Sequence, residues 1–228
     1  MNDTMQSAAM SAYSLIPGKA EIQIEKMPIV RHLGLAGYVP TYQAMRRFTD
    51  SRGAKTPDEL WVLEHPPVYT VGIAGRAEHF PRSGEVPVER VDRGGQITYH
   101  GPGQSIVYAL VDLTRRGLTV RAMVALLERA VIDTLRGHDV MAERRDHAPG
   151  VYVGGAKIAA LGLRVRRGCC YHGVALNVDM DLAPFSAIDP CGYPGLALTQ
   201  ARAHGVLANA QGMGDELARR IARLIERK

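Results

Sequence analysis

Residues 93–104, with the sequence RGGQITYHGPGQ, constrain the fold more than any other stretch of this chain. Four glycines and one proline interrupt regular structure here, because glycine adopts backbone conformations closed to other residues and proline lacks an N–H group. Polar side chains occupy the positions between them. The apolar run at residues 106–111 follows directly and predicts a buried strand. The sequence therefore predicts a polar, glycine-lined loop that the core holds in place.

Hydrophobic periodicity predicts the remaining elements. We expect strands at 29–33, 60–63, 68–71, 88–91, 158–165 and 174–178. The last two alternate apolar and polar residues, so each should have one buried and one polar face. Helices are expected from Pro40, from a cap at Thr119 and from a cap at Asp215. These elements predict an α+β (mixed α/β) fold, a single domain of helices packed on a largely antiparallel sheet.

The length of 228 residues suits one sizeable domain. We expect residues 1–25 to form a flexible N-terminal extension and residues 26–228 to form the domain. No run of about 18 apolar residues occurs, and the first residues do not resemble a secretory signal, so we expect neither a membrane protein nor a secreted one. The net charge of +5 is modest, and no basic run is interleaved with aromatics, so nucleic acid is not the expected partner.

Three cysteines occur, at 169, 170 and 191, and none belongs to a Cys-x-x-Cys pair. This pattern argues against a zinc site and favours a reducing, cytoplasmic setting. Cys191 lies between prolines and glycines on a tight turn, where an exposed thiol and a buried one are about equally expected. Cys169 and Cys170 compete with it as a nucleophile, and a dyad of Cys170 with His172 is geometrically conceivable.

A cysteine nucleophile needs a nearby cation, because the free thiol has a pKa of roughly 8.5. Lys157, at the start of a predicted strand, is the candidate, although a lysine in such a position is usually solvated. His100 and His172 are each a base, a ligand or a structural residue. Two histidines without a carboxylate cluster make a poor metal site, and the glycines fit no phosphate-binding pattern.

Five segments together resemble the octanoyltransferases of lipoate biosynthesis in order and spacing. They are residues 63–70 (LEHPPVYT), 93–104, 155–162 (GAKIAALG), 172–178 (HGVALNV) and 190–192 (PCG). The resemblance implies a fold similar to the catalytic domain of biotin and lipoate protein ligases. It also implies a catalytic pair in which Cys191 carries an acyl thioester and Lys157 lowers the pKa of its thiol and assists proton transfer.

The same resemblance implies which residues line the substrate pocket. They are Arg93, Gly94, Gly95, Gln96, Ile97, Thr98, Tyr99, His100, Ala160, Leu161, Gly162, Gly173, Val174 and Ala175. Small residues among them, such as Gly162 and Gly173, should leave room for a fatty chain.

The implied reaction moves an octanoyl group from octanoyl-acyl carrier protein to a lysine of a lipoyl domain. The implied acceptors are lipoyl domains of 2-oxoacid dehydrogenases and the glycine cleavage H protein. No cofactor and no metal are implied, because the thioester donor is already activated. Three alternatives stay open: an ATP-dependent ligase, a non-catalytic acyl-binding or lipoyl-domain-binding module, and a cysteine hydrolase.

Overall fold

Strand β6 (Gln104–Asp112) lies in the middle of the computed structural model, which describes residues 27–81, 84–146, 148–189 and 195–227. Its side chains alternate between two buried clusters. Val107 and Val111 belong to one cluster, and Ile106 and Leu110 belong to the other. Because both faces are covered, this strand is a continuous apolar run instead of an alternating one.

Two sheets contain the described strands. The six-stranded sheet has the order β1-β2-β6-β9-β8-β7, and the three-stranded sheet has the order β4-β3-β5. The strands are β1 (Ile29–Leu35), β2 (Glu59–Glu64), β3 (Val68–Val71), β4 (Val88–Arg90), β5 (Ile97–His100), β6 (Gln104–Asp112), β7 (Val151–Val153), β8 (Ala156–Arg166) and β9 (Cys169–Asn177). Pairs β1–β2 and β3–β4 are parallel and the other pairs are antiparallel, which confirms the expected mixed, largely antiparallel architecture.

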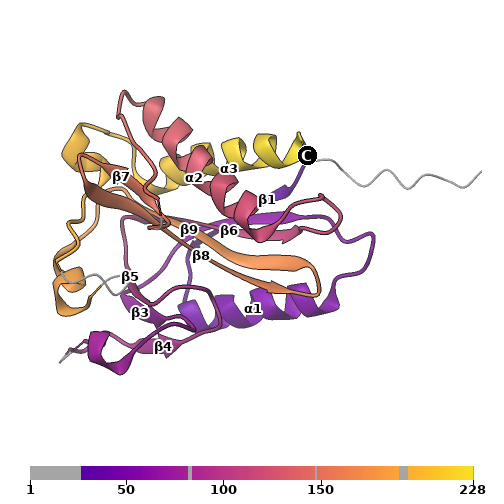
Figure 1. Cartoon of the computed structure of the whole chain (residues 1–228), viewed down its shortest axis with the longest axis horizontal. Coiled ribbons are helices and arrows are strands. Elements are labelled where there is room, and N and C mark those ends of the chain that lie inside the picture. The colour runs from indigo at the N-terminus through magenta and orange to yellow at the C-terminus, as the bar shows by residue number, and fades with distance from the viewer. Residues whose placement is uncertain (1–26, 82–83, 147, 190–194, 228) are drawn as a thin grey trace, which may run out of the picture.

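Helices cover both faces of the large sheet. They are α1 (Tyr38–Ser51), α2 (Val120–Arg136) and α3 (Ala210–Glu226), with short 3₁₀ turns η1 (Ala77–His79), η2 (Ala183–Ala187) and η4 (Ala201–His204). Figure 1 shows α2 and α3 side by side over one face, and α1 with the small sheet on the other. The small sheet thereby lies against β8 and β9, where segments from distant parts of the sequence meet.

Most predicted elements are confirmed, and α2 is confirmed with its cap. The Thr119 hydroxyl oxygen accepts a hydrogen bond from the backbone N–H of Ala122 at 3.1 Å. The predicted start of the last helix was wrong. Asn209 caps α3 through the Gly212 N–H at 2.9 Å, and Asp215 lies inside the helix.

Two further expectations were wrong for a tertiary reason. Residues 93–104 do not form one loop, because β5 occupies their middle and pairs with β3. Strand β9 is buried along its whole length, so the predicted polar face does not exist. At its expected polar positions, Ala175 belongs to a cluster with Met45 of α1, and Asn177 is hydrogen-bonded to Gln104 and to the Thr199 carbonyl. Periodicity along the chain does not reveal such contacts.

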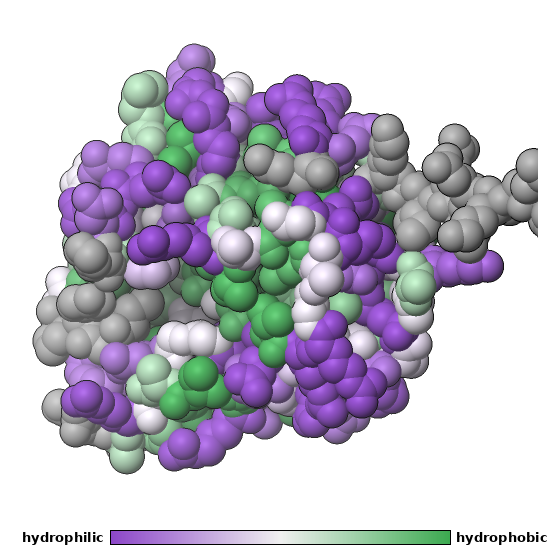
Figure 2. All heavy atoms as spheres, turned by 45° about the vertical axis from the view of Figure 1, so that its right-hand side comes forward, coloured by the Kyte–Doolittle hydropathy of each residue, from purple (hydrophilic) through white to green (hydrophobic). Residues whose placement is uncertain are grey.

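Hydrophobic and hydrophilic residues are unevenly distributed over the surface. Figure 2 shows one face on which hydrophobic atoms gather in the middle and hydrophilic atoms surround them. Among the described helices, none combines the length and the apolar character that crossing a membrane requires. The predicted extension at residues 1–25 lies outside the described residues, and the predicted domain bounds stay a prediction.

Candidate active site

A pocket with about 520 Å³ of empty space, its open mouth included, lies between the small sheet and strands β8 and β9. Its walls come from five elements or segments of the chain that are far apart in sequence. The lining residues are Tyr38, Arg93, Gly95, Gln96, Ile97, Thr98, His100, Ile106, Tyr108, Ala160, Leu161, Gly162, His172, Gly173, Val174 and Ala175. The fold therefore gathers most of the predicted pocket residues around one space, although their role in binding stays a prediction.

Two of the predicted residues, Gly94 and Tyr99, do not line this pocket. The Gly94 N–H donates to the Leu163 carbonyl at 2.9 Å, which fastens the glycine segment to β8. The Tyr99 ring packs instead against Tyr69 and Phe185, each with a ring-centroid distance of 5.4 Å. Both residues support the pocket from behind.

Gly173 is small for a different reason from the one expected. A Cβ atom added there would lie 2.1 Å from the Val107 carbonyl oxygen on β6. At Gly162 the added Cβ would lie 3.0 Å from the Gly94 carbonyl oxygen and 3.1 Å from Cδ of Arg93. The two glycines thus permit close approach of backbone segments, and the room inside the pocket is not set by them alone.

A buried chain of hydrogen bonds runs behind the pocket from Arg93 to Asn177. The Arg93 guanidinium donates to the Thr70 hydroxyl oxygen at 2.9 Å, and the Thr70 hydroxyl meets Nε2 of His100 at 3.3 Å. Nδ1 of His100 lies 2.7 Å from the side-chain oxygen of Gln104. The Gln104 amide then donates to the Asn177 side-chain oxygen at 2.9 Å.

These partners fix where the imidazole proton sits. The Gln104 oxygen only accepts, so Nδ1 of His100 carries the hydrogen and Nε2 accepts from Thr70. Burial, with smaller effects of His65 and Arg93, lowers the pKa of His100 to about 3. His100 is therefore a neutral structural member of the site and not a titrating base near neutral pH.

A second imidazole, His65, stands beside it in the same state. Its Nδ1 lies 2.5 Å from the Ala36 carbonyl, and its Nε2 accepts from the Tyr108 hydroxyl at 2.8 Å. Burial lowers the pKa of His65 to about 4. The buried Tyr38 ring meets the His65 ring edge-on at 5.0 Å, and no partner for the Tyr38 hydroxyl is found among the described residues.

His172 completes the aromatic wall. Its Nε2 lies 3.2 Å from a carboxylate oxygen of Asp92, and its ring stacks on that of Tyr42 at 5.5 Å. Burial lowers the pKa of His172 against the opposing effect of Asp92. The Tyr171 hydroxyl donates to the other Asp92 oxygen, and bonds to His172 and Tyr171 outweigh burial and lower the pKa of the Asp92 carboxyl.

Sequence reasoning missed Tyr38, Tyr108 and Asp92 as members of this site. Tyr38 is on the first turn of α1 and Tyr108 is within the apolar run of β6, where each resembles an ordinary core residue. Asp92 immediately precedes the predicted stretch at Arg93, and that adjacency is the one signal the sequence offered.

Lys157 is buried, with 4% of its surface exposed, at the start of β8. Its Nζ donates to the Pro149 carbonyl at 3.2 Å and lies 5.4 Å from the centre of the Tyr152 ring. The solvated position usual for such a lysine does not apply. A smaller pocket, of about 280 Å³, contains Lys157 and shares Thr98 and Ala160 with the larger one, so the lysine lies next to the larger pocket.

Two of the three candidate cysteine nucleophiles lie in the described part of the chain. Cys169 and Cys170 are buried, and burial raises the pKa of Cys170 to about 12. Cys170 Sγ points to the Ala109 carbonyl in the cluster under α2 and α3, whereas His172 faces Asp92, so the two form no dyad. Neither thiol has the environment of a nucleophile. Cys191 lies outside the described residues.

No group of three His, Cys, Asp or Glu side chains suited to a metal ion occurs within residues 27–81, 84–146, 148–189 and 195–227. Most polar groups of the site are instead hydrogen-bonded to one another, and the Tyr38 hydroxyl is an exception. The arrangement offers a pocket with apolar walls, a hydrogen-bonded wall of mostly neutral side chains that includes the Arg93 guanidinium, and one buried amine beside it.

Comparison with known proteins gives concordant results. Residues 40–196 match the family described as the lipoyl protein ligase A/B catalytic domain. An octanoyltransferase of Dechloromonas aromatica is 54% identical over 201 residues, covering 88% of this chain and 98% of that protein. One of Thiobacillus denitrificans is 60% identical over 188 residues, covering 82% and 86%.

Solved structures extend the likeness of the fold. Lipoate-protein ligase A bound with ATP superposes with a TM-score of 0.67 at 17% identity, covering 87% of this chain and 83% of that one. Biotin protein ligase from Aquifex aeolicus superposes with a TM-score of 0.52 at 10% identity, covering 86% and 69%. These neighbours confirm the expected similarity to ligase catalytic domains.

Proposed function

The chain belongs to the lipoyl protein ligase A/B catalytic domain family, among relatives that are octanoyltransferases, and from this premise we propose that it transfers octanoyl through a thioester on Cys191. The chain is a transferase that moves octanoyl groups in protein lipoylation. The proposal concerns how it does so: Cys191 is the nucleophile, Lys157 is its cationic partner, and the pocket holds the acyl chain.

The pocket supports this assignment by its character. Its floor and walls include Ile97, Ile106, Leu161 and Val174, which offer apolar contact to a linear chain. Burial of a methylene contributes about 0.8 kcal/mol, so an octanoyl tail gains several kcal/mol of binding free energy. The neutral state of His100 suits such a tail, because a charged imidazole beside it would be poorly solvated.

The buried amine of Lys157, adjacent to this pocket, is the single observation that carries the mechanism. A cationic amine stabilises a thiolate and so raises the fraction of Cys191 that can attack. The thiolate attacks the carbonyl carbon of the donor thioester. A new C–S bond forms and the donor C–S bond breaks. The donor thiolate leaves as a thiol with the proton of the Lys157 ammonium, which leaves Lys157 neutral and able to accept a proton in the next step.

The second half of the cycle consumes the acyl-enzyme. The deprotonated amine of the acceptor lysine attacks the thioester, the amide bond forms, and the Cys191 thiolate leaves. The proton lost from the amine passes to Lys157 or to a water beside it. Amide formation from a thioester is downhill, so this step drives the cycle.

The proposed donor is octanoyl-acyl carrier protein, and the proposed acceptors are lipoyl domains. The net charge of +5 favours an acidic donor and acceptor through long-range attraction, which salt weakens.

Intact-mass measurement tests the proposal directly. The enzyme incubated with octanoyl-acyl carrier protein should gain one octanoyl group and lose it when a lipoyl domain is added. Cys191→Ala should abolish the adduct and the transfer, and Lys157→Ala should slow adduct formation by at least about a hundredfold, in the range that loss of a catalytic proton-transfer group costs.

Cys169→Ser and Cys170→Ser are the matched controls and should retain the adduct. Persistence of the adduct in Cys191→Ala would move the nucleophile elsewhere. Modification of a lipoyl domain that requires ATP and free octanoate, with no carrier protein, would replace the transfer mechanism with that of a ligase.

A further inference from the structure

One peptide group, the one that joins Pro149 to Gly150, lies between Lys157 and the buried carboxylate of Glu128. Its carbonyl oxygen accepts from Lys157 Nζ at 3.2 Å. Its N–H donates to Oε1 of Glu128 at 3.0 Å. The planar Pro149–Gly150 peptide group is therefore hydrogen-bonded on both sides, to the Lys157 amine and to the Glu128 side chain of α2.

The backbone at this point is built to bring the groups together. Gly150 has a φ of +139°, and a Cβ atom added there would lie 3.0 Å from Cε of Lys157 and 2.9 Å from the Ala159 carbonyl oxygen. A residue with a side chain would push the lysine away from its place. The glycine is thus required by the approach of the peptide group to Lys157.

Glu128 is well placed to hold this peptide group firmly. It is 7% exposed, and it projects from the middle of α2, whose apolar residues are part of the main core. A buried carboxylate that accepts a backbone N–H forms a charge-assisted bond, which is stronger than a neutral one. Hydrogen bonds in series polarise one another, so the carbonyl becomes a better acceptor for the lysine ammonium.

We propose that Glu128 is a positioning residue, which holds the Lys157 amine in its catalytic place through the Pro149–Gly150 peptide group. This inference rests on the proposed function, because it assigns a role to Glu128 only through Lys157. Glu128 does not touch the reacting atoms and is not itself a catalytic residue.

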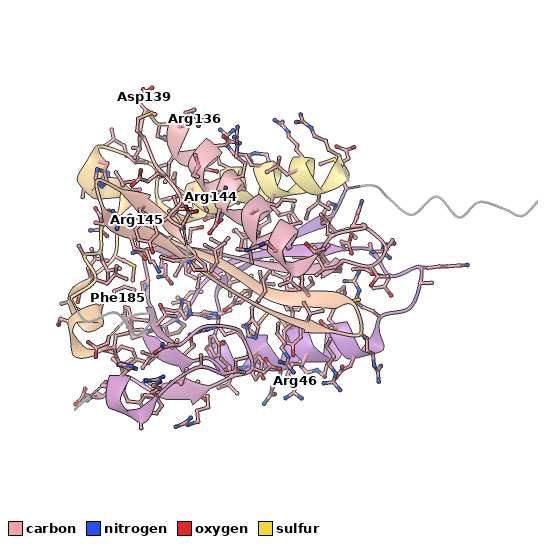
Figure 3. The ribbon with its side chains drawn as sticks, viewed as in Figure 1. Arg46, Arg136, Asp139, Arg144, Arg145 and Phe185 are labelled. Atoms are coloured by element: carbon pink, nitrogen blue, oxygen red, sulfur yellow. The ribbon has the colours of Figure 1, made fainter. Side chains whose placement is uncertain are left out.

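Among the described residues, two arginines and one further carboxylate lie near Glu128 and the Tyr152 ring. Arg144 lies 3.6 Å from Oε2 of Glu128, and the Arg145 guanidinium lies 4.7 Å from the centre of the Tyr152 ring that Lys157 also faces. Figure 3 labels both arginines, in the region where α2 passes β7. Glu143 pairs with Arg145 at 3.8 Å and is largely exposed, so it does not share the role of Glu128.

Three substitutions of Glu128 separate the effect of an oxygen within hydrogen-bond distance of Gly150 from the effect of the negative charge. Glu128→Gln keeps an oxygen that accepts from Gly150 and should keep the rate of single-turnover octanoylation within about threefold of the unmodified enzyme. Glu128→Asp keeps the charge but is shorter by one methylene, and Glu128→Ala removes both. We expect each of the latter two to lower that rate by about tenfold or more, with KM for the donor little changed.

The pH profile of single-turnover octanoylation supplies the second readout. Displacement of the amine should move the profile of Glu128→Asp and Glu128→Ala toward higher pH, because the thiolate then loses its cationic support. Rates are normalised to the folded fraction from a thermal melt, which removes a merely structural loss. Glu143→Gln, an exposed glutamate in the segment after α2, is the control and should change neither the rate nor the profile.

The outcomes distinguish the two proposals. Activity retained by Cys191→Ala or Lys157→Ala would contradict the proposed function. If those two variants are inactive while folded Glu128→Asp matches the unmodified enzyme in rate and pH profile, the positioning role is wrong. Should Glu128→Ala fail to fold, the contrast between Glu128→Gln and Glu128→Asp still decides the matter.

Discussion

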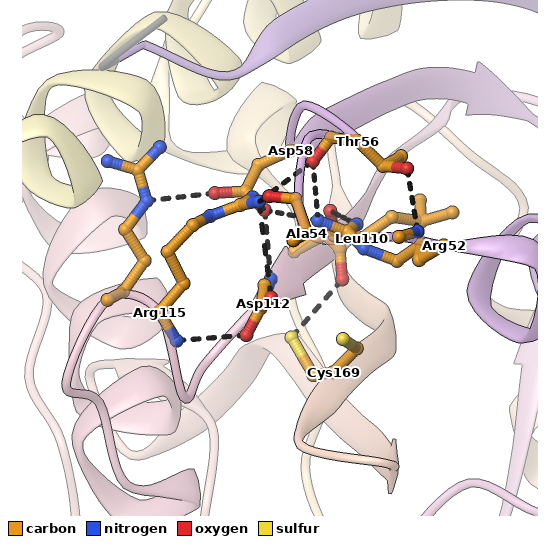
Figure 4. A network of polar contacts seen from close by, with 12 residues as sticks. Arg52, Ala54, Thr56, Asp58, Leu110, Asp112, Arg115 and Cys169 are labelled. Carbon is orange, nitrogen blue, oxygen red and sulfur yellow. Dashed lines mark hydrogen bonds and ion pairs between the residues drawn. The ribbon is translucent and has the colours of Figure 1, made fainter. Parts of the chain in front are cut away.

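The two ends of strands β2 and β6 bury polar groups in opposite ways. At one end Asp58, just before β2, forms ion pairs with several arginines, and Figure 4 shows this network. At the other end of the nine-residue strand β6, Gln104 begins the hydrogen-bonded wall of the pocket. The eight steps between Asp112 and Gln104 span about 27 Å at roughly 3.4 Å per residue. The first network is charged, whereas the second consists mostly of neutral side chains and includes one cation, Arg93.

Asp58 is fully buried and bonds three guanidinium groups. Arg52 and Arg115 approach one of its oxygens at 2.6 Å, and Arg116 approaches the other at 2.8 Å. The backbone N–H of Asp112 donates to it as well, at 2.9 Å. The cluster thereby ties the segment after α1 to the turn after β6, far from the pocket.

The pocket network shows the other solution. His65 and His100 are held neutral, and each ring nitrogen has one defined partner. Its donors and acceptors run in one direction from Arg93 to Asn177. The difference teaches that charge is concentrated where it ties segments together, whereas the buried histidines of the pocket wall are kept neutral.

Loss of Asp58 should have the largest effect on stability. Asp58→Asn removes the charge that compensates Arg52, whose side chain is 3% exposed. Breaking a buried ion pair on one side costs about 3–5 kcal/mol, and urea unfolding would measure that loss. Octanoyl transfer per folded molecule should be unchanged, since the cluster lies far from the pocket.

The control is Asp133→Asn, because Asp133 also pairs with two arginines but on the surface, where Arg129 and Arg136 are more than half exposed. Exposed pairs of this kind contribute about 0–1 kcal/mol. Equal losses for Asp58→Asn and Asp133→Asn would break the comparison.

Mild acid should cause the next largest loss in the free energy of unfolding, because two histidines at the pocket end are buried in the neutral state. The pKa values of His65 and His100 are about 4 and about 3 in the folded chain, below the ordinary 6.5. Below pH 6.5 the two imidazoles therefore bind protons in the unfolded chain but stay neutral in the folded chain until the pH approaches their lower pKa values. Their contribution is complete above pH 6.5, and it falls by up to about 1.4 kcal/mol per pH unit for each histidine as pH drops below 6.5 toward these folded values.

Urea unfolding at pH 7.5 and pH 5 measures this loss. His100→Gln should reduce the decline by about 2 kcal/mol, its share over one and a half pH units below 6.5. His204→Gln, at an exposed position, should leave the decline unchanged. A slope that is insensitive to His100→Gln would mean that the ring is already protonated in the folded state.

Thr70→Val should have the smallest effect on stability and still reach catalysis. It removes the hydroxyl that accepts from Arg93 and donates to Nε2 of His100. An unsatisfied buried partner costs about 1–3 kcal/mol, and the Arg93 bond to the Thr70 carbonyl at 2.6 Å remains to limit the loss.

We expect Thr70→Val to lower the free energy of unfolding in urea by an amount near the lower end of that range. Octanoyl transfer should fall about tenfold, because the Arg93 and His100 side chains in the pocket wall lose a hydrogen-bond partner that fixes their positions. Transfer that is unaffected while stability falls would show that the network only stabilises the fold.

Much of the fold follows from the chain read locally. The apolar run of β6, strand β8 and the Thr119 cap of α2 depend on neighbouring residues, and each was predicted at nearly its observed place. Strand β9 begins at Cys169, five residues before its predicted start. Strand β5 was hidden because glycines flank it, and the start of α3 was hidden by Gly212 and Gly214 in its first turns. Both form because tertiary pairing and packing outweigh weak local preference.

The site divides in the same manner. Most residues of the motif segments line one pocket, and their role in substrate binding stays a prediction. Asp92, Tyr38 and Glu128 escaped notice because their partners lie in other elements: His172 in β9, His65 after β2, and Gly150 before β7.

By itself, then, the sequence predicted most of the strands and helices and the short motifs to which we assign the chemistry. Only the tertiary structure decided that Lys157 is buried against a backbone carbonyl, that His100 keeps its proton on Nδ1, and that Gly173 serves strand packing. The physical reason is that burial, proton position and steric room are set by neighbours from distant parts of the chain.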